Sequence, residues 1–555
     1  MGGPLLVVGL DGATFDLIEP WAAAGRLPVL AGLLARGSHG RLRSTLPAAT
    51  FPAWTSLVTG VNPGRHGVLD FAERVPGTYR VRFVNGSHRR TPALWTRLCA
   101  AGRRMAVLTV PATYPPEPVR GLMISGWDTP LTTAVDGSFV HPRERWPGLR
   151  EVVGRLPFSD FQEVDTGPGW HERALASLLD GIRRRTALVT HLLEREPWDA
   201  LMVVYGESDT VAHHFWRFHD PGSPRHEASP FGDAVLRVYR ALDEALGVIL
   251  AAAPAQATVA VVSDHGSGGA SDLVVHLNRR LAAEGFLRFR AAGGRSARVL
   301  RALALRAVPV GLQGRLLRRL PGAAGRLEGL ARLGAVDWAG TAAYSEELDY
   351  HPSVWLNLAG REPEGRVPAA RYAEVREAAA ACLAAWRHQD GRPVVRRVWR
   401  REEVYHGPAT ERAPDLLLEL AELDGHLPSC LRSDGPGPAV RRLPRAAWGA
   451  GRGGGMSGSH RREGVFMLAG RGVRAAGRLD AAEVTDVLPT LLALTGLPVP
   501  DGLDGQPIVA ALETPPRTAP ELLADRAAAP LPPSAAADRE LAARLEALGY
   551  LEPAG

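Results

Sequence analysis

The sequence predicts an α/β fold with a mostly parallel central sheet and helices on both of its faces. In the first half of the chain, short continuous apolar runs rich in valine alternate with segments of helical periodicity. Continuous apolar runs are typical of strands buried on both faces of a parallel sheet. Their alternation with helices is typical of a doubly wound sheet. The expected strands are Leu5–Leu10, Met105–Val110, Leu201–Tyr205 and Thr258–Val262, and the expected helices are about Pro28–Arg36, Ala174–Arg195 and Ala234–Ala253.

The chain of 555 residues is too long for one ordinary core, so we expect a large α/β domain with insertions. Residues 1–285 should form the first part of the core, and residues 341–512 should complete it, with further insertions. Residues 286–340 are rich in Arg, Ala and Leu at helical spacing and predict an inserted helical cap. We interpret its arginines as solvated rather than as a face for a membrane or an anionic substrate. Residues 513–555 resemble a Pro/Ala-rich linker followed by a short amphipathic helix.

The composition is that of a soluble globular protein, with 45% hydrophobic and 22% charged residues. No apolar run approaches the ~20 residues of a membrane-spanning helix. A net charge of +6 permits acidic substrates such as phosphates but does not indicate specific nucleic-acid binding. The three cysteines are far apart, and no signal peptide is recognisable, so we expect a cytoplasmic protein. The oligomeric state is left open.

Potential metal ligands follow three of the expected strands at the point where each strand ends. Asp11 follows the first, Asp209 and His213 follow the third, and Asp264 and His265 follow the fourth. Open α/β sheets bind ligands in the crevice beyond the carboxyl ends of their strands, so these side chains can converge. Each alone could be a helix-capping aspartate or an ordinary histidine. Together they favour a metal site.

Two further observations support this interpretation. Asp209 and His213 are four residues apart, which places both on one face if the stretch is helical. His460 lies in a glycine-rich segment just before another short apolar run, at Val465–Leu468.

Thr50 is the candidate nucleophile. The residues after it, Phe51 to Thr59, can form a helix, with Pro52 in the first turn, where proline is tolerated. Thr50 could then be an ordinary N-cap. Alternatively, its hydroxyl could bind a dication and become an alkoxide more readily at neutral pH. The backbone N–H of Phe51 could then bind a phosphoryl oxygen. Residue types alone leave both interpretations open.

Several motifs are spread along the chain. They are Gly9-Leu-Asp11-Gly, Thr50-Phe-Pro-Ala-Trp-Thr-Ser, Asn62-Pro-Gly-Arg-His66-Gly and Ser263-Asp-His-Gly266. Together they resemble the type I phosphodiesterase/nucleotide pyrophosphatase family of the alkaline phosphatase superfamily, over about residues 5–512. Gly360-Arg-Glu-Pro-Glu-Gly365 is similar to a segment of the prokaryotic, non-secreted branch. The resemblance implies an alkaline-phosphatase-like fold.

The resemblance also implies two zinc-type ions and a covalent mechanism. One ion would be held by Asp209, His213 and His460, and the other by Asp11, Thr50, Asp264 and His265. Thr50 would attack phosphorus in line and form a phospho-threonine, which water would then hydrolyse. A ligand set of Asp and His without thiolates suits Zn or Mn.

The chain departs from the secreted members of that family at two places. They have Asn-His after their Thr-Phe-Pro, where this chain has Ala53-Trp54. They have an Asn soon after the His-Gly motif, where this chain has Asp70-Phe71. The candidate substrate contacts are therefore Phe51, Trp54 and Asp70, although core packing is the favoured interpretation of Trp54 taken singly. Asp70 would repel a dianionic monoester more than a monoanionic diester.

The expected function is metal-dependent hydrolysis of a small-molecule phosphate ester, of the phosphodiesterase or nucleotide pyrophosphatase type. A phosphomonoesterase, phosphomutase or headgroup phosphotransferase of the same superfamily is the alternative. A non-enzymatic alternative is a catalytically silent binding protein, although such a protein would be expected to have lost a ligand or the nucleophile. We expect the leaving group to be recognised by inserted segments, mainly residues 286–340 and 421–458.

Overall fold

The computed structural model describes residues 3–525 apart from residues 80, 127, 130–136, 155–168, 291–332, 348–351 and 449–455. Most of the predicted helical cap and the whole predicted C-terminal helix lie outside the described residues.

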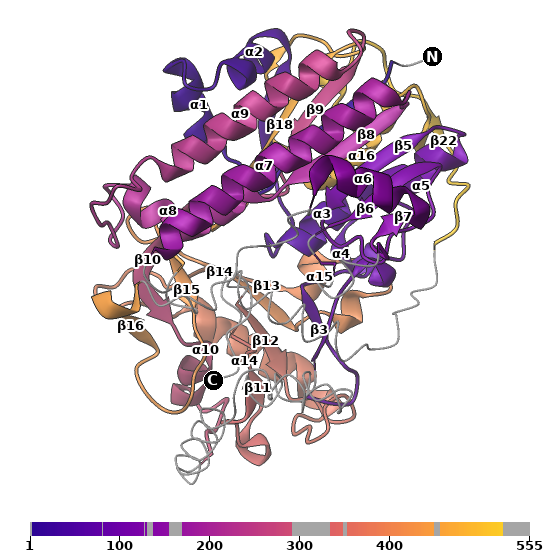
Figure 1. Cartoon of the computed structure of the whole chain (residues 1–555). Helices are drawn as coiled ribbons and strands as arrows, with labels where there is room; N and C mark the ends of the chain where they lie inside the picture. Colours follow the sequence, from indigo (N-terminus) through magenta and orange to yellow (C-terminus); the bar gives the residue numbers. More distant parts are fainter. Residues whose placement is uncertain are drawn as a thin grey trace.

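A ten-stranded sheet forms the centre of the molecule (Figure 1), with the order β19-β2-β18-β9-β1-β8-β5-β6-β7 and β20 beside β2. The parallel centre consists of β9 (Thr258–Val262), β1 (Leu5–Leu10), β8 (Ala200–Tyr205), β5 (Met105–Val110) and β6 (Gly121–Ser125). Antiparallel pairs are made by β18 (Glu463–Gly470) with β9 and with β2 (Ser38–Arg43), and by β7 (Val140–His141) with β6. The short strands β19 (Gly477–Arg478) and β20 (Ala482–Glu483) run parallel to β2. The predicted mostly parallel sheet is confirmed.

Helices cover both faces of this sheet. Leu6 and Val8 of β1 belong to a buried cluster with residues of α7 (Trp170–Arg195) and α9 (Ala234–Ala252), which lie side by side in Figure 1. Leu5 and Val7 belong to a second cluster, with residues of α3 (Thr50–Thr59), α5 (Leu94–Ala100) and α16 (Val487–Leu494). Successive side chains of a strand point to opposite faces, so β1 is buried on both sides. This explains its continuous apolar run.

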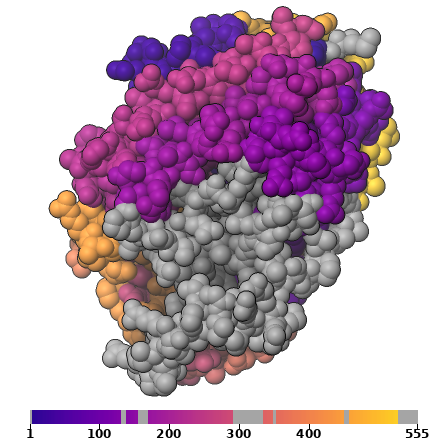
Figure 2. Space-filling view, viewed as in Figure 1, coloured from indigo at the N-terminus to yellow at the C-terminus, as the bar shows by residue number. Residues whose placement is uncertain are grey.

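The remaining helices are short or flank the sheet. They are α1 (Phe15–Ala23), α2 (Pro28–Arg36), α4 (Pro63–His66), α6 (Trp146–Val153), α8 (Glu207–His219), α10 (Leu277–Ala283), α14 (Tyr372–Ala384) and α15 (Arg401–Val404). In the space-filling view, side chains of residues 170–195 and 234–252 form a closed surface over one face of the sheet (Figure 2). Within the described part of the chain, no single helix is both long and apolar enough to cross a membrane; α1 and α2 pass that test only as a pair bent by 98°.

A second sheet is built from an insertion and lies apart from the central sheet (Figure 1). It is antiparallel, in the order β11 (Ala343–Tyr344), β12 (Ser353–Leu356), β14 (Leu416–Leu420), β13 (Val395–Arg400). All four strands lie within residues 341–512, for which insertions were expected beside the parts that complete the core. The later strands β18, β19 and β20 are the ones that complete the central sheet.

A third sheet joins the other two regions. Its long strand, β10 (Gly266–Val275), pairs with β15 (Leu427–Cys430), β16 (Val440–Arg442) and β17 (Gly458–Arg461). Two small pairs complete the described strands, β3 (Ala72–Arg74) with β4 (Val81–Phe83), and β21 (Val499–Pro500) with β22 (Thr518–Ala519). In the β10–β17 pair, His460 lies opposite Ser267. The residue after Asp264 and His265 begins β10, so this pairing brings His460 beside them.

Candidate active site

The predicted ligands converge at the carboxyl edge of the central sheet. Strands β9, β1 and β8 are neighbours, so the residues after their last positions meet at one place. Asp11 directly follows β1, and Asp264 and His265 follow β9 after one serine. Helix α8 begins two residues after β8 and carries Asp209 and His213 on consecutive turns. The prediction that these two share a helix face is confirmed by their contact.

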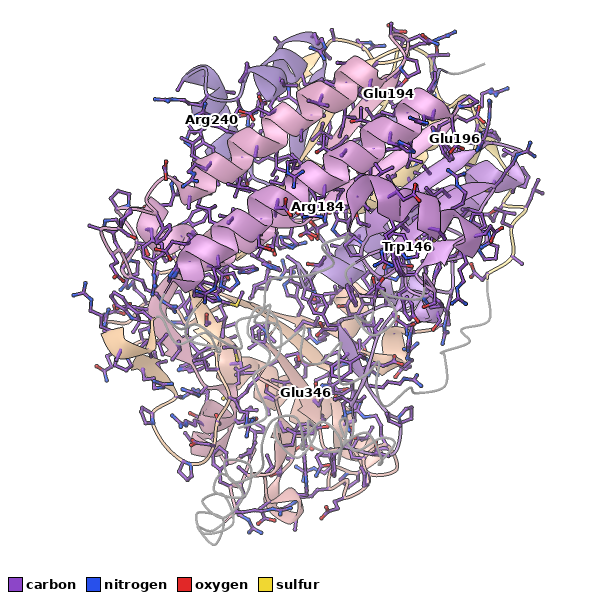
Figure 3. The ribbon with its side chains drawn as sticks, in the orientation of Figure 1. Trp146, Arg184, Glu194, Glu196, Arg240 and Glu346 are labelled. Carbon is purple, nitrogen blue, oxygen red and sulfur yellow. The ribbon has the colours of Figure 1, made fainter. Side chains whose placement is uncertain are left out.

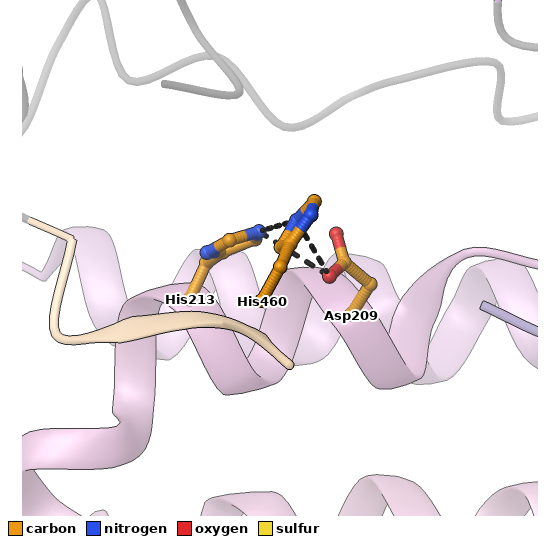
Figure 4. A group of neighbouring side chains, drawn as sticks. All are labelled: Asp209, His213 and His460. Atoms are coloured by element: carbon orange, nitrogen blue, oxygen red, sulfur yellow. Dashed lines mark hydrogen bonds and ion pairs between the residues drawn. The ribbon is translucent and has the colours of Figure 1, made fainter. Parts of the chain in front are cut away.

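Asp209, His213 and His460 form one group of potential metal ligands (Figure 4). Oδ1 of Asp209 lies 3.2 Å from Nε2 of His213 and 3.5 Å from Nε2 of His460. The two Nε2 atoms are 3.0 Å apart. All three side chains are buried. Two imidazole nitrogens and a carboxylate oxygen converging in this way are the donor set of a zinc-type ion with one position open.

Asp11, Asp264 and His265 form the second group. Nε2 of His265 lies 3.5 Å from Oδ1 of Asp11 and 3.3 Å from Oδ2 of Asp264. These two carboxylate oxygens are buried and accept no hydrogen bond from any residue that the structure describes. A buried anionic oxygen without a donor is costly, so both oxygens fit a cation. The rings of His265 and His460 stack at 3.8 Å, which makes the two groups neighbours.

The three histidines are oriented for metal binding by backbone carbonyls. The Nδ1–O distances are 3.2 Å for His213 to Gly458, 3.0 Å for His265 to Gly266, and 2.6 Å for His460 to Ala48. A carbonyl oxygen can only accept, so each Nδ1 carries the proton and donates. In the neutral form of each ring, the lone pair of Nε2 therefore faces the carboxylates. Histidines that bind metals typically have the other ring nitrogen bonded to a carbonyl or carboxylate in this way.

Thr50 is the first residue of α3, and Ala49 occupies the N-cap position with extended backbone angles. The interpretation of Thr50 as an ordinary N-cap is therefore wrong. Its side chain is 1% exposed, and Oγ1 lies 3.5 Å from Nε2 of His265. The helix can begin here because Pro52, in the first turn, has no N–H to leave unpaired. The positive end of the helix dipole therefore faces the second group, as a phosphoryl oxygen would require.

The carboxylates in this site influence one another strongly. Burial, and then repulsion from Asp209, raises the pKa of Asp11 well above its usual value. Burial and repulsion from Asp11 do the same to the pKa of Asp264. Burial also opposes ionisation of Asp209, but attraction to His213 and His460 outweighs it and lowers the pKa of Asp209. Burial lowers the pKa of His265, which favours the neutral form that binds metals.

Trp54 lies beneath the site and binds a metal-ligand candidate. Its Nε1 donates to Oδ2 of Asp11 at 2.8 Å, and its side chain is 0% exposed. A Cβ at Gly9 would come within 2.4 Å of the indole ring, so only glycine at this position admits the indole against β1. The predicted contact of Trp54 with substrate stays a prediction. What the structure shows is that the indole holds Asp11 with Oδ1 directed at His265.

The other two candidate substrate contacts, Phe51 and Asp70, also have structural partners. The ring of Phe51 packs on Phe71, with centroids 4.7 Å apart, inside a small apolar cluster. Its predicted role depends on the backbone N–H and stays a prediction. Asp70 lines a cavity beside the site, and its Oδ1 accepts from the N–H of Phe71 at 2.7 Å.

Three serines tie the strand ends together, and sequence reasoning missed them. Ser208 donates to the carbonyl of Asp11 at 2.6 Å, and Ser267 donates to the carbonyl of Gly12 at 2.7 Å. Ser263 accepts from the N–H of Ala13 at 3.0 Å. Each bond joins residues about 200 or more positions apart, so only their placement beside the ligands could have suggested them.

A cavity of about 710 Å³ opens beside His460. Ala48, Asp70 and His460 contribute to its wall from the core, and Trp355 and Trp399 contribute from the second sheet. The expectation that the leaving group is recognised mainly by residues 286–340 and 421–458 stays a prediction, because residues 291–332 and 449–455 lie outside the described part of the chain. Among the described residues, most of the cavity lining that does not come from the core lies at positions 346–420.

Replacing Trp54 with Phe should weaken metal binding at the second group about 10- to 100-fold, because residues that hydrogen-bond a metal ligand typically contribute this much to affinity. The substitution keeps most of the ring but removes the donor to Asp11. Trp95→Phe is the matched control, because Trp95 is buried in the same apolar cluster and its Nε1 has no hydrogen-bond acceptor among the described residues. Competition with a chromophoric chelator measures the affinity. Equal affinities in the two variants would show that Trp54 only packs.

Metal removal should destabilise the protein more as the pH rises. A carboxyl whose pKa is raised on folding favours the folded state below its unfolded value of about 3.8, and this contribution is lost as the pH rises through the folded value. Asp11 and Asp264 behave in this way, while Asp209, with a lowered pKa, opposes them. In the metal-loaded protein, bound cations would take the place of the protons on Asp11 and Asp264 and offset the charge of the carboxylates. The difference in unfolding temperature between zinc-loaded and EDTA-treated protein should therefore grow from pH 5 to pH 8, measured by calorimetry. A constant or shrinking difference contradicts this.

Comparison with known proteins agrees with this geometry. The family model described as type I phosphodiesterase / nucleotide pyrophosphatase matches residues 5–434. This range contains Thr50 and every ligand candidate except His460.

Individual relatives are more distant. Ectonucleotide pyrophosphatase/phosphodiesterase family member 1 from mouse is 24% identical over 289 residues, which are 50% of this chain and 26% of the mouse protein. The human protein of the same name is 37% identical over 68 residues, 12% of this chain and 7% of its own length. The chain thus spans about a quarter or less of the curated relatives that it matches.

The solved structures that match this chain are also distant in sequence. Human ectonucleotide pyrophosphatase/phosphodiesterase 5 has a TM-score of 0.47 at 12% identity, covering 92% of this chain and 100% of that one. The murine protein has a TM-score of 0.44 at 12% identity, covering 89% and 96%. The family match extends over well more than half of the sequence, and the chain belongs to the type I phosphodiesterase / nucleotide pyrophosphatase family.

Proposed function

We propose that this protein hydrolyses small-molecule phosphate esters of the phosphodiesterase or nucleotide pyrophosphatase type, with Thr50 as its nucleophile and two divalent ions. The observation that carries the proposal is the position of Thr50. Its hydroxyl lies at the N-terminus of α3, 3.5 Å from a histidine of one ligand group, and that histidine stacks on a histidine of the other. Family membership supports the same chemistry.

The chain's own residues divide the work between them. Asp209, His213 and His460 would hold one ion, and Asp11, Asp264 and His265 would hold the other together with Thr50. When bound, two divalent ions would stabilise the attacking and leaving oxygens and lower the pKa of the hydroxyl that they contact. A donor set of Asp and His without cysteine suits Zn or Mn.

Thr50 Oγ1 would attack phosphorus in line, forming a phospho-threonine as the bond to the leaving alcohol oxygen breaks. The first backbone N–H groups of α3 point toward this place and would stabilise the negative charge that develops on the phosphoryl oxygens. Water would then attack the phospho-threonine, release the phosphate product and return the proton to Thr50. Burial of the site excludes competing solvent and strengthens each of these electrostatic interactions.

Asp70 supports a preference for diesters. It lines the cavity that His460 also lines, where its negative charge would repel the second charge of a monoester. A diester carries only one charge at its phosphorus and meets less repulsion.

Thr50→Ala should keep its bound metal but lose at least about 10³-fold in kcat, because it removes the nucleophile. Thr59→Ala is the control, since Thr59 is a buried threonine of the same helix whose hydroxyl only donates to the carbonyl of Thr55.

The wild-type protein should hydrolyse bis-p-nitrophenyl phosphate faster than p-nitrophenyl phosphate. The reverse order would indicate a monoesterase, and no turnover of either with both metals bound would indicate a silent binding protein.

A further inference from the structure

Strand β13 carries two consecutive arginines, Arg396 and Arg397, that both line the cavity beside the ligand groups. Consecutive residues of a regular strand point to opposite faces. Here the register shifts: Val395 pairs with Leu420, and Arg397 pairs with the next residue of β14, Glu419. Arg396 is therefore the extra residue of a β-bulge, and bulges re-aim side chains. The bulge explains how two neighbouring guanidinium groups reach one wall.

Arg396 and Arg397 differ from the glutamates and the other arginines that line the cavity, because those residues form ion pairs with one another. Every glutamate that lines the cavity is within ion-pair distance of an arginine. The pairs are Glu73 with Arg412, Glu346 (labelled in Figure 3) with Arg74, Glu419 with Arg462, Glu422 with Arg461, and both Glu463 and Glu483 with Arg43. Arg396 and Arg397 are exposed and have no ion pair with any residue that the structure describes. They are the uncompensated positive charges of the cavity.

Arg397 is also held in place. Its guanidinium carbon lies 3.2 Å from the centre of the Trp399 ring. The indole is fixed in turn, because its Nε1 donates to Oε2 of Glu419 at 2.8 Å. A guanidinium stacked on a fixed ring keeps its N–H groups in one plane and loses little freedom when it binds a planar or bidentate anion.

We propose that Arg396 and Arg397 bind a second anionic group, a phosphate or a carboxylate, on the ester that the active site cleaves. The proposal rests on the proposed function for its substrate, but not for the binding itself. His460 and both arginines line the same cavity, so one molecule can reach both. At about 710 Å³, the cavity is within the range of small-molecule sites. The preferred substrate would then carry one anion at the cleaved phosphorus and another at its far end.

The test uses p-nitrophenyl phosphodiesters whose second alcohol ends in a hydroxyl, a carboxylate or a phosphate, each with linkers of two, four and six carbons. The leaving group is the same throughout, so the chemistry is constant. With the zinc-loaded full chain, at least one anionic ester should show a kcat/KM about 10- to 100-fold above that of its hydroxyl partner, as expected for charge-assisted hydrogen bonds. The carboxylate and phosphate arms show which anion is preferred. Equal values at every length would overturn the proposal.

The double variant Arg396→Gln/Arg397→Gln should lose this preference while keeping the wild-type rate on the hydroxyl ester. Arg400→Gln is the matched control, because Arg400 lies on the same strand, pairs with Glu377 and Glu403, and is not part of the cavity wall. It should keep the preference. A preference that survives in the double variant contradicts the proposal.

A binding measurement separates this proposal from the proposed function. Inorganic pyrophosphate should bind the EDTA-treated wild-type protein in isothermal titration, and the double variant should bind it at least 10-fold more weakly. Arginine-dependent binding without hydrolysis of any ester would leave the anion site standing and overturn the hydrolase. Hydrolysis of the esters with neither arginine-dependent binding of pyrophosphate nor a preference for anionic esters would support the hydrolase and overturn the anion site.

Discussion

Three buried aspartates, Asp11, Asp209 and Asp264, meet at one edge of the central sheet, and their mutual repulsion is the constraint on which the site depends. Removing carboxylates from water costs several kcal/mol each unless they are compensated. The adjacent histidines donate Nδ1–H to backbone carbonyls, so in their neutral forms they present Nε2 lone pairs to the aspartates. In the proposed mechanism, two divalent cations would compensate these charges and would also activate the hydroxyl of Thr50.

The scaffold is arranged to bring these charges together. Strand β1 lies between β8 and β9, so the residues after all three strands share one crevice. Gly12, with φ of +67°, allows the turn after Asp11, and a Cβ there would lie 2.8 Å from Oδ1 of Asp209. Trp54 holds one oxygen of Asp11 and leaves the other directed at the site. His460 also lines a cavity whose wall is completed by residues of the inserted sheet, so the proposed catalytic residues and the proposed selectivity residues come from different parts of the fold.

Much of this arrangement could be predicted from the sequence. Strands buried on both faces leave continuous apolar runs, so β1, β5, β8 and β9 were recognisable, and with them the strand-end ligands. The hydrogen bond from Trp54 to Asp11 could not be predicted from the sequence, because it depends on the space that Gly9 leaves beside the indole ring. The strands of the second sheet have the same apolar pattern as core strands, so the pattern alone does not show which sheet they join. The sequence also does not predict that Arg396 and Arg397 line the same cavity. This depends on a β-bulge, where side chains do not alternate between the two faces of the strand.

The central claim is that two neighbouring groups of side chains each hold one divalent ion. Anomalous diffraction from crystals of the zinc-loaded protein, recorded on either side of the zinc absorption edge, tests it most directly. The account predicts two peaks, one among Asp209, His213 and His460 and one among Asp11, Asp264 and His265, the second also beside Oγ1 of Thr50. A single peak, or peaks away from these side chains, would contradict it.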